Sequence, residues 1–187
     1  NEIAEVRVTG TADLIDKNNQ YLSQNMVLGL SIAFFIIGII VLIIFRSFYM
    51  LFVTWLVNLV PLLIVGGVMG LLGIDLRIST SLIFSIAFGI AVDDTIHFLT
   101  RYKMELRSGR SSLYALKRSF ISTGKAITMT SIMLCAGFVT LVFSDFMSTY
   151  YIGLLVSITL FFAVLIDLTL LPVLLIYWKN SKTIKES

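Results

Sequence analysis

Charged residues are scarce in this chain of 187 residues. They make up 13% of it, against about 25% in an average soluble domain, whereas hydrophobic residues make up 58%. A folded chain of this size does not have enough interior to hide so much apolar surface from water. The composition therefore excludes a soluble globular domain and a disordered chain, and it indicates a membrane protein.

Cysteine and proline are also rare. The chain has one cysteine, Cys135, and two prolines. A single cysteine excludes a disulfide scaffold within the chain, and so little proline excludes a collagen-like repeat. What the chain has instead is long runs of apolar residues.

Five apolar stretches are each long enough to cross the hydrocarbon core of a bilayer, which takes about 20 helical residues. They run over Met26–Phe45, Phe48–Leu72, Thr80–Thr100, Ile127–Phe143 (extended by residues 122–126) and Tyr150–Trp178. Because no water in the bilayer core satisfies the backbone, each stretch must be a helix. The sequence therefore predicts an all-α membrane protein with a bundle of five transmembrane helices.

The basic residues fall mainly on one side of this bundle. With alternating spans, eleven of the 14 Lys and Arg residues lie on the side of loop 102–122 and of the tail 179–187. The positive-inside rule then places the N-terminus outside and the C-terminus in the cytoplasm. Apolar residues at helical spacing between the cations of loop 102–122 indicate a surface helix on anionic headgroups, with a cytoplasmic partner protein as the alternative.

The first residues do not match the apolar pattern of the rest. Glu2–Thr9 alternates as a strand does, and Thr11–Gln24 is an amphipathic lead-in to the first span. A lone strand is not stable without partner strands. We therefore expect residues 1–24 to be the end of an external α/β domain with its lead-in helix, residues 25–178 the transmembrane domain, and residues 179–187 a cytoplasmic tail of a longer protein.

Two adjacent carboxyls lie inside the third stretch, Asp93 and Asp94. Each ionised carboxylate at such a depth costs about 2.5–3.5 kcal/mol, so these groups normally serve a purpose. Mutual repulsion and loss of water favour proton uptake by at least one of them, as a proton carrier requires. His97 follows Asp93 by four residues and can share its helix face. Gly89, four residues before Asp93, permits close approach of another helix.

Other roles for this acidic pair remain open. A basic residue of another helix could hold Asp93 and Asp94 as a packing lock, and His97 could be an interfacial residue. Metal binding by the three side chains is disfavoured, because neighbouring aspartates point about 100° apart on a helix. We predict no metal site and no cofactor.

Polar residues also occur in the second, fourth and last stretches. Thr128 and Ser131 could donate hydrogen bonds to the carboxylates, or only to carbonyls of their own helix. We expect the remaining polar and helix-bending residues to have structural roles: Asn58, Pro61, Asp167 and Pro172.

Four motifs give the chain a family resemblance. They are Val8–Thr11, Asn58–Pro61, Gly89–Phe98 and Asp167–Pro172. With them the chain resembles the C-terminal membrane half of the resistance-nodulation-division (RND) superfamily, in its MMPL-type or predicted hydrophobe-exporter branch. The resemblance implies a pseudo-symmetric transporter with two repeats of six helices, of which these five spans are the last.

The resemblance also implies a site. Relatives of this kind take in protons and expel hydrophobic molecules, and their GxxxD element maps onto Gly89 and Asp93, with Asp94 adjacent. A Thr-Ser pair that lines the relay in the multidrug branch matches Thr130 and Ser131. That branch carries lysine where Asp93 stands, so the resemblance favours a relay of opposed carboxylates, with His97 passing protons inward.

We therefore expect a C-terminal fragment of an exporter of hydrophobic or lipid-like molecules, driven by the proton-motive force in the bacterial cytoplasmic (inner) membrane. It is not expected to be an enzyme or to bind nucleic acid. Its expected partners are membrane lipids, a hydrophobic or lipid substrate and the N-terminal half of the same protein, with a homo-oligomer (dimer or trimer) left open. The alternatives are a non-transporting lipid- or sterol-sensing bundle and an intramembrane aspartyl hydrolase that uses Asp93 with Asp167.

Overall fold

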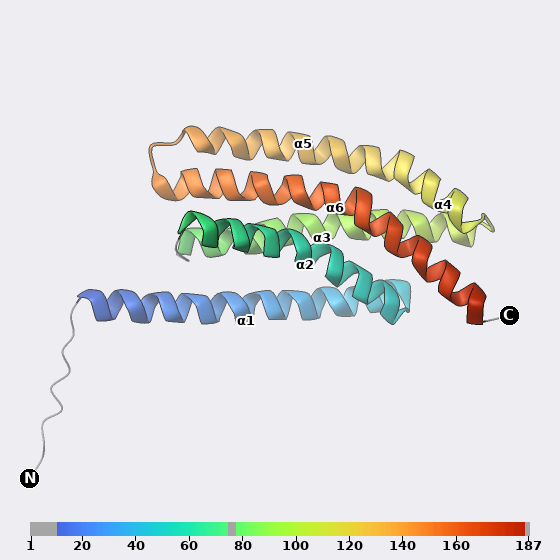
Figure 1. Ribbon diagram of the computed structural model, residues 1–187, viewed down its shortest axis with the longest axis horizontal. Coiled ribbons are helices and arrows are strands. Elements are labelled where there is room, and N and C mark those ends of the chain that lie inside the picture. The colour runs from blue at the N-terminus through green and yellow to red at the C-terminus, as the bar shows by residue number, and fades with distance from the viewer. Residues whose placement is uncertain (1–10, 75–77, 186–187) are drawn as a thin grey trace, which may run out of the picture.

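The computed structural model describes residues 11–74 and 78–185, and within them every regular element is a helix (Figure 1). The elements are α1 (Thr11–Phe45), α2 (Phe48–Leu72), α3 (Ile78–Arg107), α4 (Ser112–Ser119), the π-helical turn η1 (Phe120–Gly124), α5 (Lys125–Thr140), the 3-10 turn η2 (Leu141–Phe143) and α6 (Met147–Lys185). The all-α architecture is confirmed. The strand expected at Glu2–Thr9, and with it the end of an external domain, lies outside the described residues.

The number of spans is also confirmed, since five stretches of helix are long and apolar enough to cross a membrane. These are Leu28–Phe45, Phe48–Leu72, Ile83–Arg107, Ser112–Phe143 and Met147–Tyr177. The expected lead-in to the first span is continuous with it, because α1 runs without a break from Thr11 to Phe45. In Figure 1 the N-terminal part of α1 extends beyond the ends of the neighbouring helices.

The segment 102–122 contains a short helix, as the apolar spacing between its cations predicts. Helix α3 continues to Arg107, and a short turn leads into α4. Gly109 provides the turn with a left-handed backbone (φ 76°), and the Ser111 hydroxyl caps α4 by accepting from the Tyr114 amide at 3.4 Å. The cations of this segment therefore lie at the end of α3, in the turn (Arg110) and on α4.

Helix α6 is the centre of the bundle. It packs against α2, α3 and α5, while α1 contacts only α2 and α3 among the more extensive helix pairs. Figure 1 shows the same order, with α1 and α5 on opposite sides. Most apolar side chains of these two outer helices are exposed, as expected for surfaces that face lipid or further protein.

Helices α5 and α6 approach each other most closely at Gly153. A Cβ placed on Gly153 would lie 2.6 Å from the carbonyl oxygen of Phe138 and 2.7 Å from Cβ of Leu141. No side chain fits at that separation, so glycine is required for this contact. One turn further along α6, the Cys135 thiol and the Ser157 carbonyl, 3.6 Å apart, continue the interface.

Helices α2 and α6 continue through Pro61 and Pro172. In Figure 1 the C-terminal part of α6 runs at an angle to its first half. A proline inside a helix removes one backbone hydrogen bond and allows such a bend.

Candidate functional site

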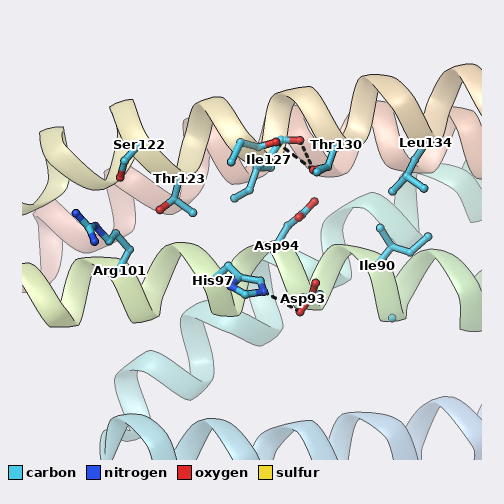
Figure 2. Close-up of a pocket in the computed structure, with 12 residues that line it drawn as sticks. Ile90, Asp93, Asp94, His97, Arg101, Ser122, Thr123, Ile127, Thr130 and Leu134 are labelled. Atoms are coloured by element: carbon cyan, nitrogen blue, oxygen red, sulfur yellow. Dashed lines mark hydrogen bonds and ion pairs between the residues drawn. The ribbon is translucent and has the colours of Figure 1, made fainter.

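A groove of about 1040 Å³ lies between α3 on one side and η1 and α5 on the other (Figure 2). We call it the acidic groove. Its α3 wall consists of Gly89, Ile90, Asp93, Asp94, His97 and Arg101. Its opposite wall consists of Ser122, Thr123, Ala126, Ile127, Thr130 and Leu134. The α3 residues recur every three or four positions, so a single face of this helix presents both carboxyls, the histidine and an arginine to the groove.

The two adjacent aspartates point in different directions. Asp93 is 71% exposed, and its Oδ1 lies 3.4 Å from Nε2 of His97, one turn along the helix. Asp94 is half-buried and points across the groove toward α5 (Figure 2). There its Oδ2 accepts a weak hydrogen bond of 3.4 Å from the Ser131 hydroxyl. The divergence follows from the 100° step between neighbours on a helix.

No lysine or arginine forms an ion pair with either aspartate in the part of the chain that the structure describes. A basic residue of this chain that would hold the pair as a packing lock is therefore not found among residues 11–74 and 78–185. In the same residues, no group of three or more His, Cys, Asp or Glu could hold a metal ion.

The hydroxyls of α5 make different contacts. The Ser131 hydroxyl reaches the carboxylate, as described above. The Thr130 hydroxyl lines the groove but donates within its own helix, 2.9 Å from the carbonyl of Ile127. The Thr128 hydroxyl also stays within its helix, 2.8 Å from the carbonyl of Gly124. Thr128 and Ser131 are the two candidates for a hydrogen bond to the carboxylates, and among the described residues only the Ser131 hydroxyl makes one.

Gly89 is on the open side of the groove. Within the described residues nothing lies within 4 Å of a Cβ placed on it. The helix expected to pack closely on Gly89 is therefore not one of these five, and that role remains a prediction for a surface outside this chain.

A second group of polar side chains lies on the opposite face of α3. It consists of Asn58 of α2, Thr95 of α3 and Asp167 of α6, and we call it the buried polar cluster. The Thr95 hydroxyl donates to Oδ1 of Asp167 on α6 at 2.8 Å. Nδ2 of Asn58 on α2 donates to the Thr95 oxygen at 3.1 Å. All three side chains are almost fully buried. Asp167 therefore bonds to a neighbouring helix, as the sequence suggests, but through a threonine that the sequence analysis did not single out.

Asp93 and Asp167, the pair that a hydrolase would need, are not brought together. Asp93 is exposed in the acidic groove, and Asp167 is buried against Thr95. They share no hydrogen-bond partner in the described part of the chain.

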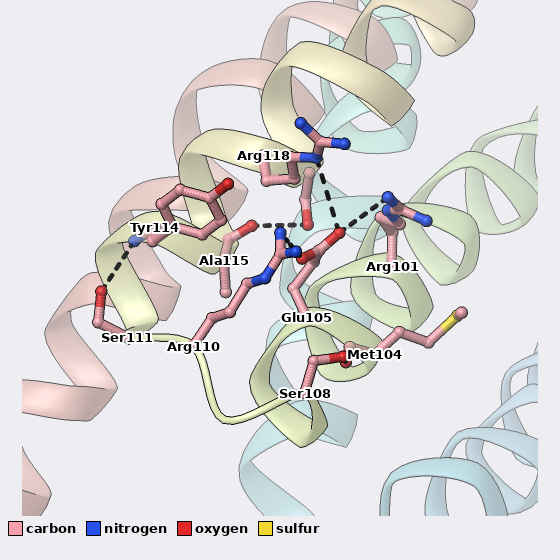
Figure 3. A network of polar contacts seen from close by, with 10 residues as sticks. Arg101, Met104, Glu105, Ser108, Arg110, Ser111, Tyr114, Ala115 and Arg118 are labelled. Atoms are coloured by element: carbon pink, nitrogen blue, oxygen red, sulfur yellow. Dashed lines mark hydrogen bonds and ion pairs between the residues drawn. The ribbon is translucent and has the colours of Figure 1, made fainter.

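A third carboxyl of α3 is surrounded by arginines (Figure 3). Glu105, whose side chain is 8% exposed, lies 2.8 Å from Arg101 and 2.8 Å from Arg110. Nε of Arg118 is 4.0 Å from the same carboxylate. This arginine cluster joins the end of α3 to the turn and to α4, and it holds Arg101 at the end of the acidic groove.

Comparison with known proteins places the chain in a family. The model of the MMPL family matches residues 1–186. MJ1562 of Methanocaldococcus jannaschii is 29% identical over 172 residues, which cover 92% of this chain and 44% of that protein. The hopanoid transporter HpnN of Burkholderia multivorans is 27% identical over 173 residues, which cover 92% of this chain and 20% of the transporter.

The chain thus spans less than half the length of these relatives. No solved structure matches it. The family model covers nearly the whole chain, and the five spans agree with a multi-pass membrane protein. On this basis the chain belongs to the MMPL family.

Proposed function

We propose that this chain is the C-terminal membrane part of an exporter of hydrophobic or lipid-like molecules, driven by protons that Asp93 and Asp94 carry. The observation that carries the proposal is the acidic groove. It presents two adjacent carboxyls within a membrane span, and no lysine or arginine of the described residues neutralises them. A carboxyl that lacks a fixed cation is suited to exchange protons.

The energies are of the right size for transport. Keeping an ionised carboxylate at membrane depth costs about 2.5–3.5 kcal/mol, and binding a proton removes the charge. A proton that crosses the membrane releases about 2.3 kcal/mol per 100 mV. One or two protons are therefore enough to shift the equilibrium between two arrangements of a helix bundle by several kcal/mol.

Each groove residue has a role in this proposal. The Ser131 hydroxyl stabilises Asp94 when it is ionised. His97 receives a proton from Asp93, which lies 3.4 Å away, and passes it toward the basic end of α3. Thr130 shapes the groove opposite Asp94. The positive-inside rule makes the basic end cytoplasmic, so protons enter from outside, where residues 1–24 would join an external domain.

The open groove also suggests a partner. Gly89 is uncovered, and the relatives are more than twice as long as the matched region. We propose that the N-terminal half of the same protein covers the groove and places its own carboxyl near Asp93, which is exposed there. The protein would then lie in the bacterial cytoplasmic membrane with its C-terminus inside.

The test uses the full-length protein in liposomes with an imposed pH gradient. Export of a labelled hopanoid, the substrate class in the name of HpnN, is measured together with proton flux. Asp93→Asn and Asp94→Asn should each reduce gradient-dependent export at least about tenfold, which corresponds to about 1.4 kcal/mol. The amount of protein in the membrane should not fall. Asp145→Asn, which changes an exposed acid outside the groove, is the matched control.

Two results would argue against the proposal. Normal gradient-dependent export by the double variant would remove the carboxyls from the proton path. Lipid binding that persists with no dependence on the gradient, in the unmodified protein, would instead favour the lipid-sensing bundle.

A further inference from the structure

The buried polar cluster contains a carboxyl, Asp167, that is not part of the acidic groove. Asp167 is 1% exposed in the middle of α6, and its one hydrogen-bond partner among the described residues is the Thr95 hydroxyl at 2.8 Å. An isolated carboxylate is costly to keep ionised in such surroundings unless a cation or several donors stabilise it. Here one neutral hydroxyl faces it.

No opposite charge approaches Asp167 from the helices packed on it. The ionisable residue of α2 is Tyr49, and between Met147 and Tyr177 those of α6 are Asp167, Tyr150, Tyr151 and Tyr177. A tyrosine carries no positive charge in either form. On α3, Asp94 is another acid, Asp93 and His97 are exposed in the acidic groove, and Arg101 is paired with Glu105. The ionisable groups of α4 and α5 are exposed, or half-buried far along the helix: Tyr114, Lys117, Arg118, Lys125 and Cys135.

The hydrogen bonds of the buried polar cluster leave acceptor atoms free for one more hydrogen. Both hydrogens of the Asn58 amide are used, one on Thr95 and one on the carbonyl of Thr54 at 2.8 Å. Oδ1 of Asn58 is buried and has no hydrogen-bond partner in the described part of the chain. The three side chains thus present more acceptors than hydrogens. An added proton would reduce this deficit.

Thr95 can adapt to that proton by turning its hydroxyl. Its oxygen lies 2.8 Å from Oδ1 of Asp167 and 3.1 Å from the carbonyl of Ala91. When Asp167 is ionised, the Thr95 hydrogen points to the carboxylate. When Asp167 holds a proton, that proton can be donated to the Thr95 oxygen, and the Thr95 hydrogen turns to the Ala91 carbonyl. The Asn58 hydrogen bond is kept in both states, so no donor is left unpaired.

From this geometry we infer that Asp167 is a second proton-binding carboxyl of the protein, and that the Thr95 hydroxyl responds to its protonation. The inference rests on the proposed function for the source of the proton. Thr95 directly follows Asp94 on α3, so one short segment of helix carries the groove carboxyl on one face and the responding hydroxyl on the other. A proton bound at Asp167 changes the hydrogen bond that joins α3 to α6.

Infrared difference spectroscopy of the purified full-length protein tests this directly, because a protonated carboxyl and a carboxylate absorb at separate frequencies. Spectra are recorded over a pH series for the unmodified protein, Asp167→Asn and Asp94→Asn. We expect Asp167→Asn to lose one carboxylic-acid band that Asp94→Asn retains. A spectrum of Asp167→Asn that matches the unmodified protein at every pH would overturn the inference.

A second pair of variants tests the response of Thr95. Thr95→Val keeps the shape of the side chain but removes the hydroxyl, and should shift the Asp167 band to higher frequency. Thr95→Ser keeps the hydroxyl and should leave the band in place. If Asp167→Asn does not reach the membrane, the two Thr95 variants still test the inference. A carboxylic-acid band that shifts in Thr95→Val but not in Thr95→Ser supports it, and the absence of any such band overturns it.

The outcomes also separate this inference from the proposed function. If Asp94→Asn retains gradient-dependent export while Asp167→Asn loses its band, the groove relay fails and the second site stands. If Asp94→Asn abolishes export while no band depends on Asp167, the relay stands and the second site is refuted.

Discussion

Asp94 and Glu105 are carboxyls of the same helix, α3, in opposite surroundings. Eleven residues separate them, which is about 16 Å along the helix. Glu105 is buried among three arginines, with two contacts of 2.8 Å. Asp94 faces an open groove and has one weak contact, 3.4 Å from the Ser131 hydroxyl.

The comparison shows how the surroundings of a carboxyl determine whether its charge is fixed or can change. A carboxylate held by several guanidinium groups is stabilised in its charged form and exchanges protons poorly. A carboxyl with one weak donor can change its charge at a much lower cost. These surroundings give Glu105 a structural role in the α3–α4 connection, and they support the proton exchange that we propose for Asp94.

Removing the acid of the arginine cluster should have the largest effect. We expect Glu105→Ala to lower the free energy of unfolding by about 2 kcal/mol, below the 3–5 kcal/mol typical of a fully buried pair, because the arginines reach solvent. Denaturant unfolding in detergent micelles measures this change. Asp145→Ala is the control and should stay within about 0.5 kcal/mol. An equal effect of both variants would contradict the structural role of Glu105.

Giving the acidic groove a permanent cation should make Asp94 resemble Glu105. Thr130 lines the groove opposite Asp94, so Thr130→Lys brings an ammonium group within reach of the carboxylate (Figure 2). A cation within about 4–6 Å favours the ionised form by about tenfold or more, so gradient-driven proton flux should fall by about that factor. Thr130→Met is the uncharged control of similar length, and a comparable loss in it would point to crowding instead.

Two side-chain pairs of α3 with the same i,i+4 spacing provide an internal comparison. Arg101 and Glu105 are 2.8 Å apart with the acid buried, whereas His97 and Asp93 are 3.4 Å apart and mostly exposed. Double-mutant cycles with alanine should give a coupling of about 1–2 kcal/mol for the first pair and less than about 0.5 kcal/mol for the second. Equal couplings would remove the distinction between the two regions.

The smallest expected effect concerns the hydroxyls of α5. Ser131→Ala removes the hydrogen bond from α5 to Asp94. At 3.4 Å this bond contributes about 0.5 kcal/mol, which is roughly a twofold change in proton-coupled transport. Thr130→Val should have no effect, because that hydroxyl bonds to its own helix. Initial rates in liposomes distinguish the two, and a larger loss in Thr130→Val would reverse the assignment.

The sequence was most informative where a property repeats along the chain. The five spans follow from apolar length alone, and the shared face of Asp93 and His97 follows from a spacing of four residues. Thr95 carried no such signal. A threonine in an apolar helix ordinarily bonds to its own backbone, as Thr128 does, and only the packing of α3 on α6 brings Thr95 to Asp167.

The arginine cluster also could not be predicted from the sequence. The sequence shows Arg110 and Arg118 only as cations of a basic segment, but the turn at Gly109 folds α4 back so that both arginines approach Glu105. Local spacing accounts for Arg101 and Glu105, four residues apart, but not for a contact made across a turn.

Both walls of the acidic groove are fastened to α6. The α3 wall is joined to it through Thr95 and Asp167, and the α5 wall through the close approach at Gly153. The walls are also joined to each other, by the Ser131–Asp94 hydrogen bond and by the ion pairs of Glu105 with Arg110 and Arg118. A helix that contributes no residue to the lining of the groove thus supports both of its walls, so a substitution in α6 can alter the site without touching it.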